Sequence, residues 1–377
     1  MDPELAPLGW AIPNAELLAA ARLDRFLARA ARTKGTTYNT YTGPKGELRL
    51  RQEIARRALR WGAALSPEDI VITSGCIEAI TLALSVVTRH GDAVAVESPT
   101  YFGLLRALEA LGLKVFELPT DATDGVDLSV LTKVLERRRV KACLFSSSFN
   151  NPLGCTMPSE KKLKVLSLLA RHRVPLVEDD INGDIYFGSE RPVPFMALDR
   201  NTNTIIYCSS FSKTIAPGYR IGWMATKTPA HMQSALERKL AFTLSGPPLL
   251  QIAFAEFLSS GGYDNHLRRI RRVFEDTIGQ MSRAVERSFP EGTKVSRPAG
   301  NFVLWLELPK PAQTAALFDK ARDNGICFVP GHVFSASGRY GHCLRLSCGH
   351  GWNERIEKGV TKLGKLVSDA AARTARQ

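Results

Sequence analysis

Seven short apolar runs alternate with helical patterns over residues 69–225, and this alternation limits the fold more than any other feature of the chain. The runs are expected as strands at 69–73, 93–97, 114–118, 141–145, 175–178, 204–208 and 221–225. Helical periodicity separates most of them, as at 101–111, 128–136 and 160–172. Such alternation is typical of a sheet that helices cover on both faces. We therefore predict an α/β fold.

A second, smaller region follows the sheet. A long helical stretch at 263–288 leads to strands expected at 302–306, 327–329 and 343–346 and to helices expected at 314–324 and 353–371. We divide the chain into a large domain, residues 41–262, and a small α/β domain, residues 263–377. Residues 1–40 are expected to form an N-terminal segment that packs with the small domain. The sequence has no repeats, low-complexity tracts or long linker.

Composition narrows the class of protein. Hydrophobic residues make up 44% of the 377, as in globular chains with an ample core. No apolar run approaches the ~20 residues that a membrane helix needs, so no membrane partner is expected. The start Met1-Asp2-Pro3-Glu4 is acidic, unlike a signal peptide. Most of the seven cysteines lie in apolar, strand-like runs. We expect reduced core cysteines in a cytoplasmic protein.

The net charge of +13 is compatible with anionic ligands or nucleic acid. The basic run at 266–272 would spread its charges over several faces of a helix, which favours a solvated surface. No helix-turn-helix, zinc finger or aromatic-studded basic sheet is recognisable, so we expect no nucleic acid partner for this chain. Strand-like spacing puts Cys343 and Cys348 on opposite faces, which disfavours zinc. No metal is expected.

The strongest chemical signal lies at residues 209–223. A strand-like run ends in a turn of small residues that holds Ser210, Ser212 and Lys213, and Arg220 follows seven residues after the lysine. A lysine that forms a Schiff base must lose its proton, which a partly buried, electropositive site favours. Hydroxyls and a guanidinium bind phosphate well. The segment indicates pyridoxal phosphate, bound at Lys213; the alternative is an exposed lysine beside an ordinary loop.

Two other strand ends fit the same cofactor. One apolar run ends in three carboxylates, and among these Asp179 could hold the pyridinium nitrogen in its protonated form. At Gly75, Cys76 and Ile77 a strand turns into a helix, whose first amides would point at an anion. Each pattern also has an ordinary structural interpretation. Carboxylates often cap the following loop, and strand–glycine–helix turns are common without phosphate.

Taken in order, the motifs resemble those of the fold-type I aminotransferases of class I and II, which use pyridoxal phosphate. The motifs are Tyr41, Ser74-Gly75, Pro99-Thr100-Tyr101, Asn151-Pro152-Leu153-Gly154, Asp179, Ser210-Phe211-Ser212-Lys213, Arg220 and Arg345-Leu346-Ser347. The closest resemblance is to the aminotransferase-like domain of MocR-type regulators of the GntR family. It covers essentially the whole chain. It implies the type I transferase fold, with a mostly parallel seven-stranded sheet between helices and a smaller α/β domain.

The resemblance also implies a role for each motif. Lys213 would carry the cofactor, Asp179 would pair with the ring nitrogen, and Asn151 would donate to the ring hydroxyl oxygen and border the substrate. Tyr101 would stack on the ring, and Arg345 would bind the substrate carboxylate. The phosphate and its surroundings would be formed by Gly75, Cys76, Ile77, Ser210, Ser212, Arg220 and Tyr41 of the partner subunit. A homodimer with a composite active site follows from this assignment.

Three positions depart from the family pattern. Asn182 stands where many relatives have a tyrosine that donates to the ring oxygen. Ala11 stands where a glycine usually borders the substrate, and Ile77 stands where the phosphate turn often has a hydroxyl. We expect these changes to preserve cofactor binding and to slow transamination.

The sequence is compatible with two functions. The first is an aminotransferase that moves an amino group between an amino acid and a 2-oxo acid. The second is the effector-sensing, dimerising domain of a MocR-type regulator, without the winged-helix domain that such regulators carry ahead of the segment Leu8–Pro13. Both need cofactor and an amino compound, so the Lys, Asp, Asn and Arg set does not separate them. No second cation that would recognise a dicarboxylate side chain can be assigned.

Overall fold

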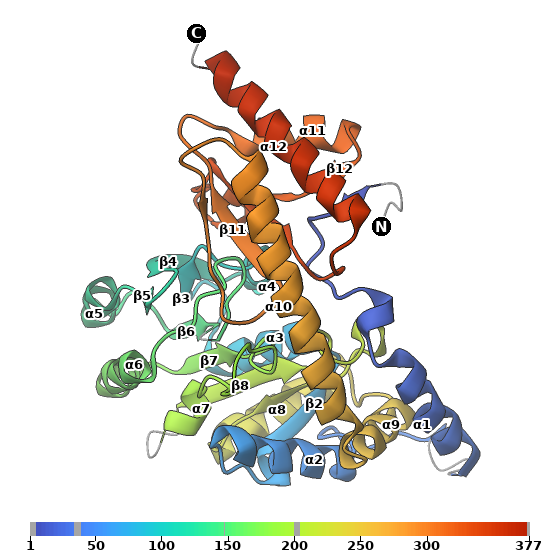
Figure 1. Cartoon of the computed structure of the whole chain (residues 1–377). Coiled ribbons are helices and arrows are strands. Elements are labelled where there is room, and N and C mark those ends of the chain that lie inside the picture. The colour runs from blue at the N-terminus through green and yellow to red at the C-terminus, as the bar shows by residue number, and fades with distance from the viewer. Residues whose placement is uncertain (1–4, 34–38, 147, 200–203, 375–377) are drawn as a thin grey trace.

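A twisted eight-stranded sheet forms the centre of the larger part of the molecule (Figure 1). The computed structural model describes residues 5–33, 39–146, 148–199 and 204–374. In order across the sheet the strands are β2 (Ile70–Thr73), β9 (Gly222–Ala225), β8 (Ile205–Ser210), β7 (Leu176–Asp179), β6 (Ala142–Phe145), β3 (Ala93–Ser98), β4 (Lys114–Asp121) and β5 (Gly125–Val126).

The sheet is mostly parallel, as predicted. Strands β4, β3, β6, β7 and β8 are parallel neighbours, and β9 runs antiparallel to both β8 and β2. All seven predicted strands are present. The eighth, β5, pairs antiparallel with the end of β4. It has only two residues, so it shows no period that could have predicted it.

Helices cover both faces of the sheet because successive residues of each strand face opposite sides. Val94 and Val96 of β3 lie in one core, and Ala95 lies in the other. The first core is closed by α3 (Cys76–Val87), α4 (Phe102–Ala110) and α8 (Pro229–Phe242). The second is closed by α2 (Leu48–Ala58), α5 (Leu128–Glu136), α6 (Ser159–His172) and α9 (Pro248–Ser259). The predicted helices at 101–111, 128–136 and 160–172 are confirmed within a residue or two.

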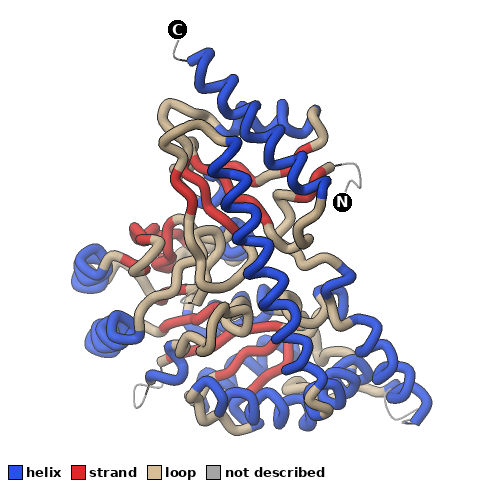
Figure 2. The backbone as a smooth tube through the Cα atoms, viewed as in Figure 1, coloured by secondary structure: helices blue, strands red, loops and turns tan. Residues whose placement is uncertain are grey.

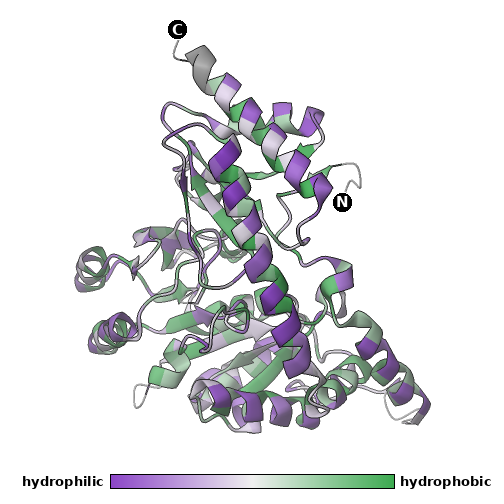
Figure 3. Cartoon of the chain, viewed as in Figure 1, coloured by the Kyte–Doolittle hydropathy of each residue, from purple (hydrophilic) through white to green (hydrophobic). Residues whose placement is uncertain are grey.

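The long helix α10 (Gly262–Ser288) runs from the large sheet to a second, four-stranded antiparallel sheet (Figure 2). This sheet has the order β10 (Lys294–Val295), β11 (Val303–Glu307), β14 (Cys343–Ser347) and β13 (Val329–Pro330). It is accompanied by α11 (Thr314–Asp323) and α12 (Glu354–Thr374). The arginines at 268, 269 and 272 lie on the exposed side of α10, whose outer face is hydrophilic (Figure 3).

The strand predicted at 327–329 is wrong as a single element. Residues 326–327 form β12 (Ile326–Cys327), which pairs parallel with β1 (Ala6–Pro7), whereas β13 pairs with β14. The chain changes partner at Phe328, and a local apolar pattern does not record such a change.

The N-terminal segment contacts both parts of the molecule. Strand β1 joins the second region through β12, and helix α1 (Ala20–Thr33) lies along α9 of the larger part. Phe26 of α1 packs on Phe257 of α9 with ring centroids 6.0 Å apart. The domain boundaries at residues 41 and 262 therefore stay predictions.

All seven cysteines are unpaired, and six of them are buried. Across the described residues, no helix is both long enough and apolar enough to cross a membrane.

Phe211 anchors the turn after β8 in the core, so its removal should lower the free energy of unfolding. Its buried ring lies 4.8 Å from Trp223, 5.5 Å from Phe254 and 5.7 Å from Tyr263, between centroids. We expect Phe211→Ala to lower the free energy of unfolding by about 3–5 kcal/mol, because the cavity cannot close. Chemical denaturation measures the change. Leu163→Ala, at a half-exposed site on α6, should stay within about 0.5 kcal/mol of wild type. A comparable loss in both variants would contradict this account.

Candidate functional site

A cavity of about 400 Å³ opens where the carboxyl ends of the parallel strands meet the second region and the N-terminal segment. Ligand sites in open α/β sheets commonly lie at this edge. The lining residues come from segments far apart in the sequence: 9–12, 76–80, 101–102, 179–182, 212–220 and 301–302, together with Ser146, Asn151 and Arg345. Within the described parts of the chain, no three His, Cys, Asp or Glu side chains are grouped as a metal ion would require.

Lys213 projects into this cavity from the turn that follows β8. Its Nζ donates a hydrogen bond to the carbonyl oxygen of Ala11 at 2.7 Å. Burial, reinforced by the positive charge of Arg345, lowers the pKa of Lys213 to about 8. The amine therefore loses its proton much more readily than an exposed lysine does, as a nucleophilic lysine must.

Asp179 ends β7 and also lines the cavity. Its carboxylate accepts hydrogen bonds from the backbone N–H of Ile181 at 3.2 Å, Cys76 Sγ at 3.3 Å and Ser146 Oγ at 3.3 Å. Burial raises the pKa of Asp179 to about 6, and these hydrogen bonds limit the rise. The group is thus mainly ionised at neutral pH and can pair with a positively charged N–H.

The start of α3 has the features of an anion-binding site. Gly75 precedes the helix with φ +91° and has no side chain with which to cap it, so the first N–H groups of the helix can face a ligand. The Arg220 guanidinium lies so close to Gly75 that an added Cβ would be 2.2 Å from Nη2. Arg220 also donates to the carbonyl oxygen of Ser74 at 2.8 Å and lies 3.5 Å from Ser212 Oγ. A helix N-terminus, a guanidinium and a hydroxyl therefore converge.

Arg345 brings a second guanidinium to the cavity from β14, where it is 2% exposed. It donates to Asn151 Oδ1 at 3.1 Å and to the carbonyl oxygen of Gly9, and its Nε has no hydrogen-bond partner. Burial lowers the pKa of Arg345 to about 10. Among the described residues no carboxylate forms an ion pair with it. A buried cation without a counter-ion is strongly disposed to bind an anion.

The other predicted residues fall into two groups. The first group lines the cavity and consists of Asn182, Ala11, Cys76, Ile77 and Tyr101. The Nδ2 of Asn182 donates to the carbonyl oxygen of Phe149 at 3.1 Å. Ser210 and Tyr41 do not line the cavity. Ser210 Oγ accepts the N–H of Ser212 at 3.3 Å, and the Tyr41 side chain is 86% exposed. The roles assigned to these residues stay predictions.

Two residues that support the site were not anticipated. Ser146 follows β6 and donates to Asp179, and its backbone N–H donates to Glu97 Oε2 at 2.6 Å. Glu97 is buried near the end of β3, and burial raises its pKa to about 8. Its place at a strand end, in the run Glu97-Ser98-Pro99, is the signal that could have identified it.

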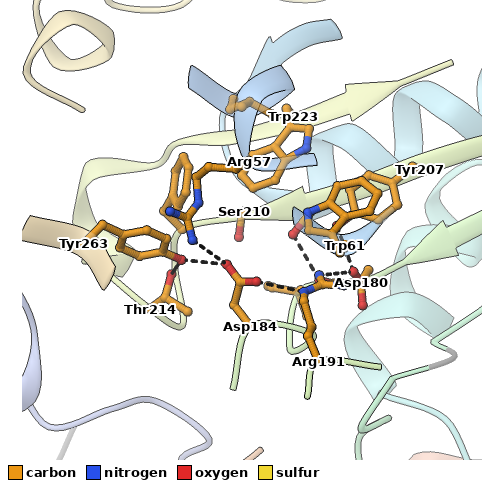
Figure 4. A pocket seen from close by; sticks show the side chains of 14 residues that line it. Arg57, Trp61, Asp180, Asp184, Arg191, Tyr207, Ser210, Thr214, Trp223 and Tyr263 are labelled. Atoms are coloured by element: carbon orange, nitrogen blue, oxygen red, sulfur yellow. Dashed lines mark hydrogen bonds and ion pairs between the residues drawn. The ribbon is translucent and has the colours of Figure 1, made fainter. Parts of the chain in front are cut away.

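Behind the turn lies a smaller cavity of about 20 Å³, bordered by a cluster of ion pairs (Figure 4). Asp184 accepts from Arg191 Nε at 2.9 Å and forms an ion pair with Arg57 at 3.8 Å. Arg191 also pairs with Asp180. Burial by itself would raise the pKa of Asp184, but the charges of Arg191 and Arg57 lower it to about 2.

This cluster supports the backbone beside Lys213 and beside Asp179. The Tyr263 hydroxyl lies 3.0 Å from Asp184 Oδ2 and 2.9 Å from Thr214 Oγ1, and Thr214 follows Lys213 in the chain (Figure 4). Asp180 follows Asp179 directly. The cluster therefore supports the two chain segments that carry the lysine and the carboxylate.

Comparisons with known proteins agree with this geometry. The family model for aminotransferases of class I and II matches residues 10–363. The chain is 38% identical over 368 residues to the uncharacterized HTH-type transcriptional regulator YdcR of Escherichia coli, covering 98% of this chain and 78% of YdcR. It is 31% identical over 372 residues to the 2-aminoadipate transaminase of Thermus thermophilus, covering 98% and 92%.

A solved structure is similar throughout. LysN, the alpha-aminoadipate aminotransferase of Thermus thermophilus, superposes with a TM-score of 0.92 at 30% identity, covering 98% of this chain and 94% of LysN. That structure was determined in complex with N-(5'-phosphopyridoxyl)-L-leucine. The predicted fold is thus confirmed.

The lowered pKa of Lys213 predicts how the cofactor attaches. Only the neutral amine attacks an aldehyde, so the attachment rate of pyridoxal phosphate to the apoprotein should rise with pH around a midpoint near 8. The rate is followed as the visible absorbance band grows after mixing. Lys213→Ala should develop no such band. A midpoint near the ordinary lysine value of 10.5 would contradict the burial argument.

The cluster behind the turn predicts a dependence of stability on pH. The pKa of Asp184 is lower in the folded chain than the ordinary 3.8, so its stabilising effect is complete above about pH 4 and is lost as pH falls toward 2. Asp184→Asn should destabilise the protein by about 1–3 kcal/mol at pH 7 and have a flatter stability profile between these values. The exposed Asp276→Asn is the control, expected to follow wild type in denaturant unfolding. Parallel profiles for wild type and Asp184→Asn would disprove this role.

Proposed function

This chain belongs to the family of class I and II aminotransferases, and we propose that it transfers an amino group between an amino acid and a 2-oxo acid with pyridoxal 5'-phosphate at Lys213. The observation that supports this most is the convergence of four groups on one cavity. These are a buried lysine with a lowered pKa, a buried carboxylate, an uncapped helix N-terminus and a buried arginine that forms no ion pair with any described carboxylate.

The cavity fits the cofactor group by group. The open N-terminus of α3 and Arg220 suit the phosphate, Lys213 suits the aldehyde, and Asp179 suits the ring nitrogen. When bound, the cofactor supplies an electron sink that eases removal of the α-proton from an amino acid.

The chain's own residues then have separate tasks. Arg345 would bind the substrate α-carboxylate through two parallel N–H donors, a geometry suited to a guanidinium. Lys213 would move a proton at the substrate α-carbon, because its lowered pKa would let it both accept and donate near neutral pH. Asn151 accepts from Arg345 through Oδ1, which leaves its NH₂ group for the ring oxygen.

We also infer a homodimer in which Tyr41 reaches the phosphate bound by the other subunit. The support is the exposure of large side chains such as Tyr41, Phe242 and Leu244, which a second copy would cover. Analytical ultracentrifugation tests the dimer. Tyr41→Ala should weaken cofactor binding although the residue lies outside its own chain's cavity.

A second function has its own support. The chain is more similar to the regulator YdcR, at 38% identity, than to the transaminase, at 31%. A sensor domain would bind cofactor and an amino compound at the same residues without turning over. Incubation with an amino acid and a 2-oxo acid separates the two, since an enzyme forms a new amino acid in many-fold excess over protein. At most one equivalent would support the sensor.

Arg345→Lys tests the assignment of the carboxylate site. One ammonium cannot reproduce the two parallel bonds of a guanidinium, so amino-acid affinity should fall by roughly ten- to a hundredfold, or about 1.5–3 kcal/mol. Titration of the cofactor's visible band with amino acid measures this. Cofactor affinity should hardly change. Loss of cofactor with an unaltered amino-acid response would assign Arg345 to the phosphate instead.

A further inference from the structure

Each cation that lines the cavity is assigned either to a group of the cofactor or to a group that all amino acid substrates have. Lys213 serves the amino group, Arg220 the phosphate and Arg345 the α-carboxylate. Among the described lining residues there is no fourth lysine or arginine and no histidine. A second carboxylate, at the far end of a substrate side chain, would find no further positive charge among the described lining residues of this chain.

One wall of the cavity is formed by the short segment 9–12. The carbonyl oxygen of Gly9 accepts from Arg345, and that of Ala11 accepts from Lys213 Nζ at 2.7 Å. The side chains of Trp10 and Ile12, from the same segment, also line the cavity. Because this segment contacts both the carboxylate-binding and the amine-binding side chains, Trp10 and Ile12 border the space beside the substrate α-carbon.

The position of this wall is fixed by packing. A Cβ added at Gly9 would lie 2.7 Å from Cys327 Sγ and 3.2 Å from the backbone of Phe328, so the segment lies directly on β12. Gly349 packs against the same segment, because a Cβ added at Gly349 would lie 2.6 Å from the carbonyl oxygen of Ile12. The indole of Trp10 is therefore presented from a rigid support, although 42% of the residue is exposed.

The rest of the lining outside the polar site is also largely apolar. Phe102 contributes from α4 and packs edge to face on Phe334 at 5.7 Å between centroids. The apolar lining residues are Trp10, Ile12, Ile77, Ile80, Phe102, Ile181, Pro217 and Phe302. A substrate side chain in this space would contact mainly apolar groups.

We propose that this site is specific for amino acids with large apolar side chains and discriminates against dicarboxylic ones. The inference rests on the proposed function, because it takes Arg345 and Lys213 as the groups that orient the substrate. Burial of a leucine-sized side chain increases affinity roughly ten- to a hundredfold. A distal carboxylate in the same space gives up its hydration and gains no counter-ion from the described lining of this chain.

The test is a comparison of amino acids on the holoenzyme. Leucine, phenylalanine, alanine, glutamate and 2-aminoadipate are each added, and both the apparent Kd and the rate are read from the cofactor's visible band. Leucine and phenylalanine should exceed glutamate and 2-aminoadipate at least about tenfold in rate over Kd. A preference for the dicarboxylates would overturn the inference while leaving the proposed function in place. No response to any amino acid would contradict the proposed function itself.

The variant Trp10→Ala tests whether the preference for large apolar side chains depends on the indole of Trp10. It should lower the response to leucine and phenylalanine about tenfold more than the response to alanine, because only the larger side chains reach the indole. Trp10→Phe should retain most of the preference, and Leu163→Ala on α6 should leave the ratio unchanged. Cofactor affinity, measured in the same titrations, should be that of wild type in all three. An equal loss for alanine and leucine in Trp10→Ala would overturn this role of Trp10.

Discussion

Two positive charges buried in one cavity, on Lys213 and Arg345, are the constraint on which the site depends. Burial lowers the pKa of both groups, and the charge of Arg345 lowers the pKa of Lys213 further. The lysine can relieve this by losing its proton, whereas the guanidinium cannot and must find an anion. The same physical conflict therefore yields an amine that loses its proton readily and, beside it, a guanidinium that is strongly disposed to bind an anion. Asp179 is the nearby negative charge that limits the repulsion.

The fold holds these charged side chains together in a buried cavity, although burial and mutual repulsion disfavour that arrangement. Strands β7 and β8 deliver Asp179 and Lys213 to the same sheet edge, and the second region delivers Arg345 on β14. The N-terminal segment closes the arrangement, since its carbonyl oxygens accept from both cations. Behind the turn, the cluster around Asp184 contacts the backbone segments beside Lys213 and Asp179. The charges at the site are thus held by contacts from parts of the chain that are far apart in sequence.

Much of this was predictable because it is local. The apolar runs and helical periods placed nearly every main element, and small residues beside Lys213 indicated the turn after β8. What the sequence did not reveal depends on contacts between distant segments. The support of Asp179 by Ser146, and of Ser146 by Glu97, needs three neighbouring strands to be known. The orientation of Ser210 away from the cavity and the split of residues 326–330 between two sheets are likewise set by pairing partners, which no local period records.

The central claim is that Lys213 is the residue that binds the cofactor covalently, and one measurement tests it most directly. Borohydride reduction of the protein loaded with pyridoxal phosphate fixes the link permanently, and peptide mapping by mass spectrometry then identifies the modified residue. The account predicts a single phosphopyridoxyl group on the peptide that contains Lys213. Modification of a different lysine, with Lys213 untouched, would contradict it.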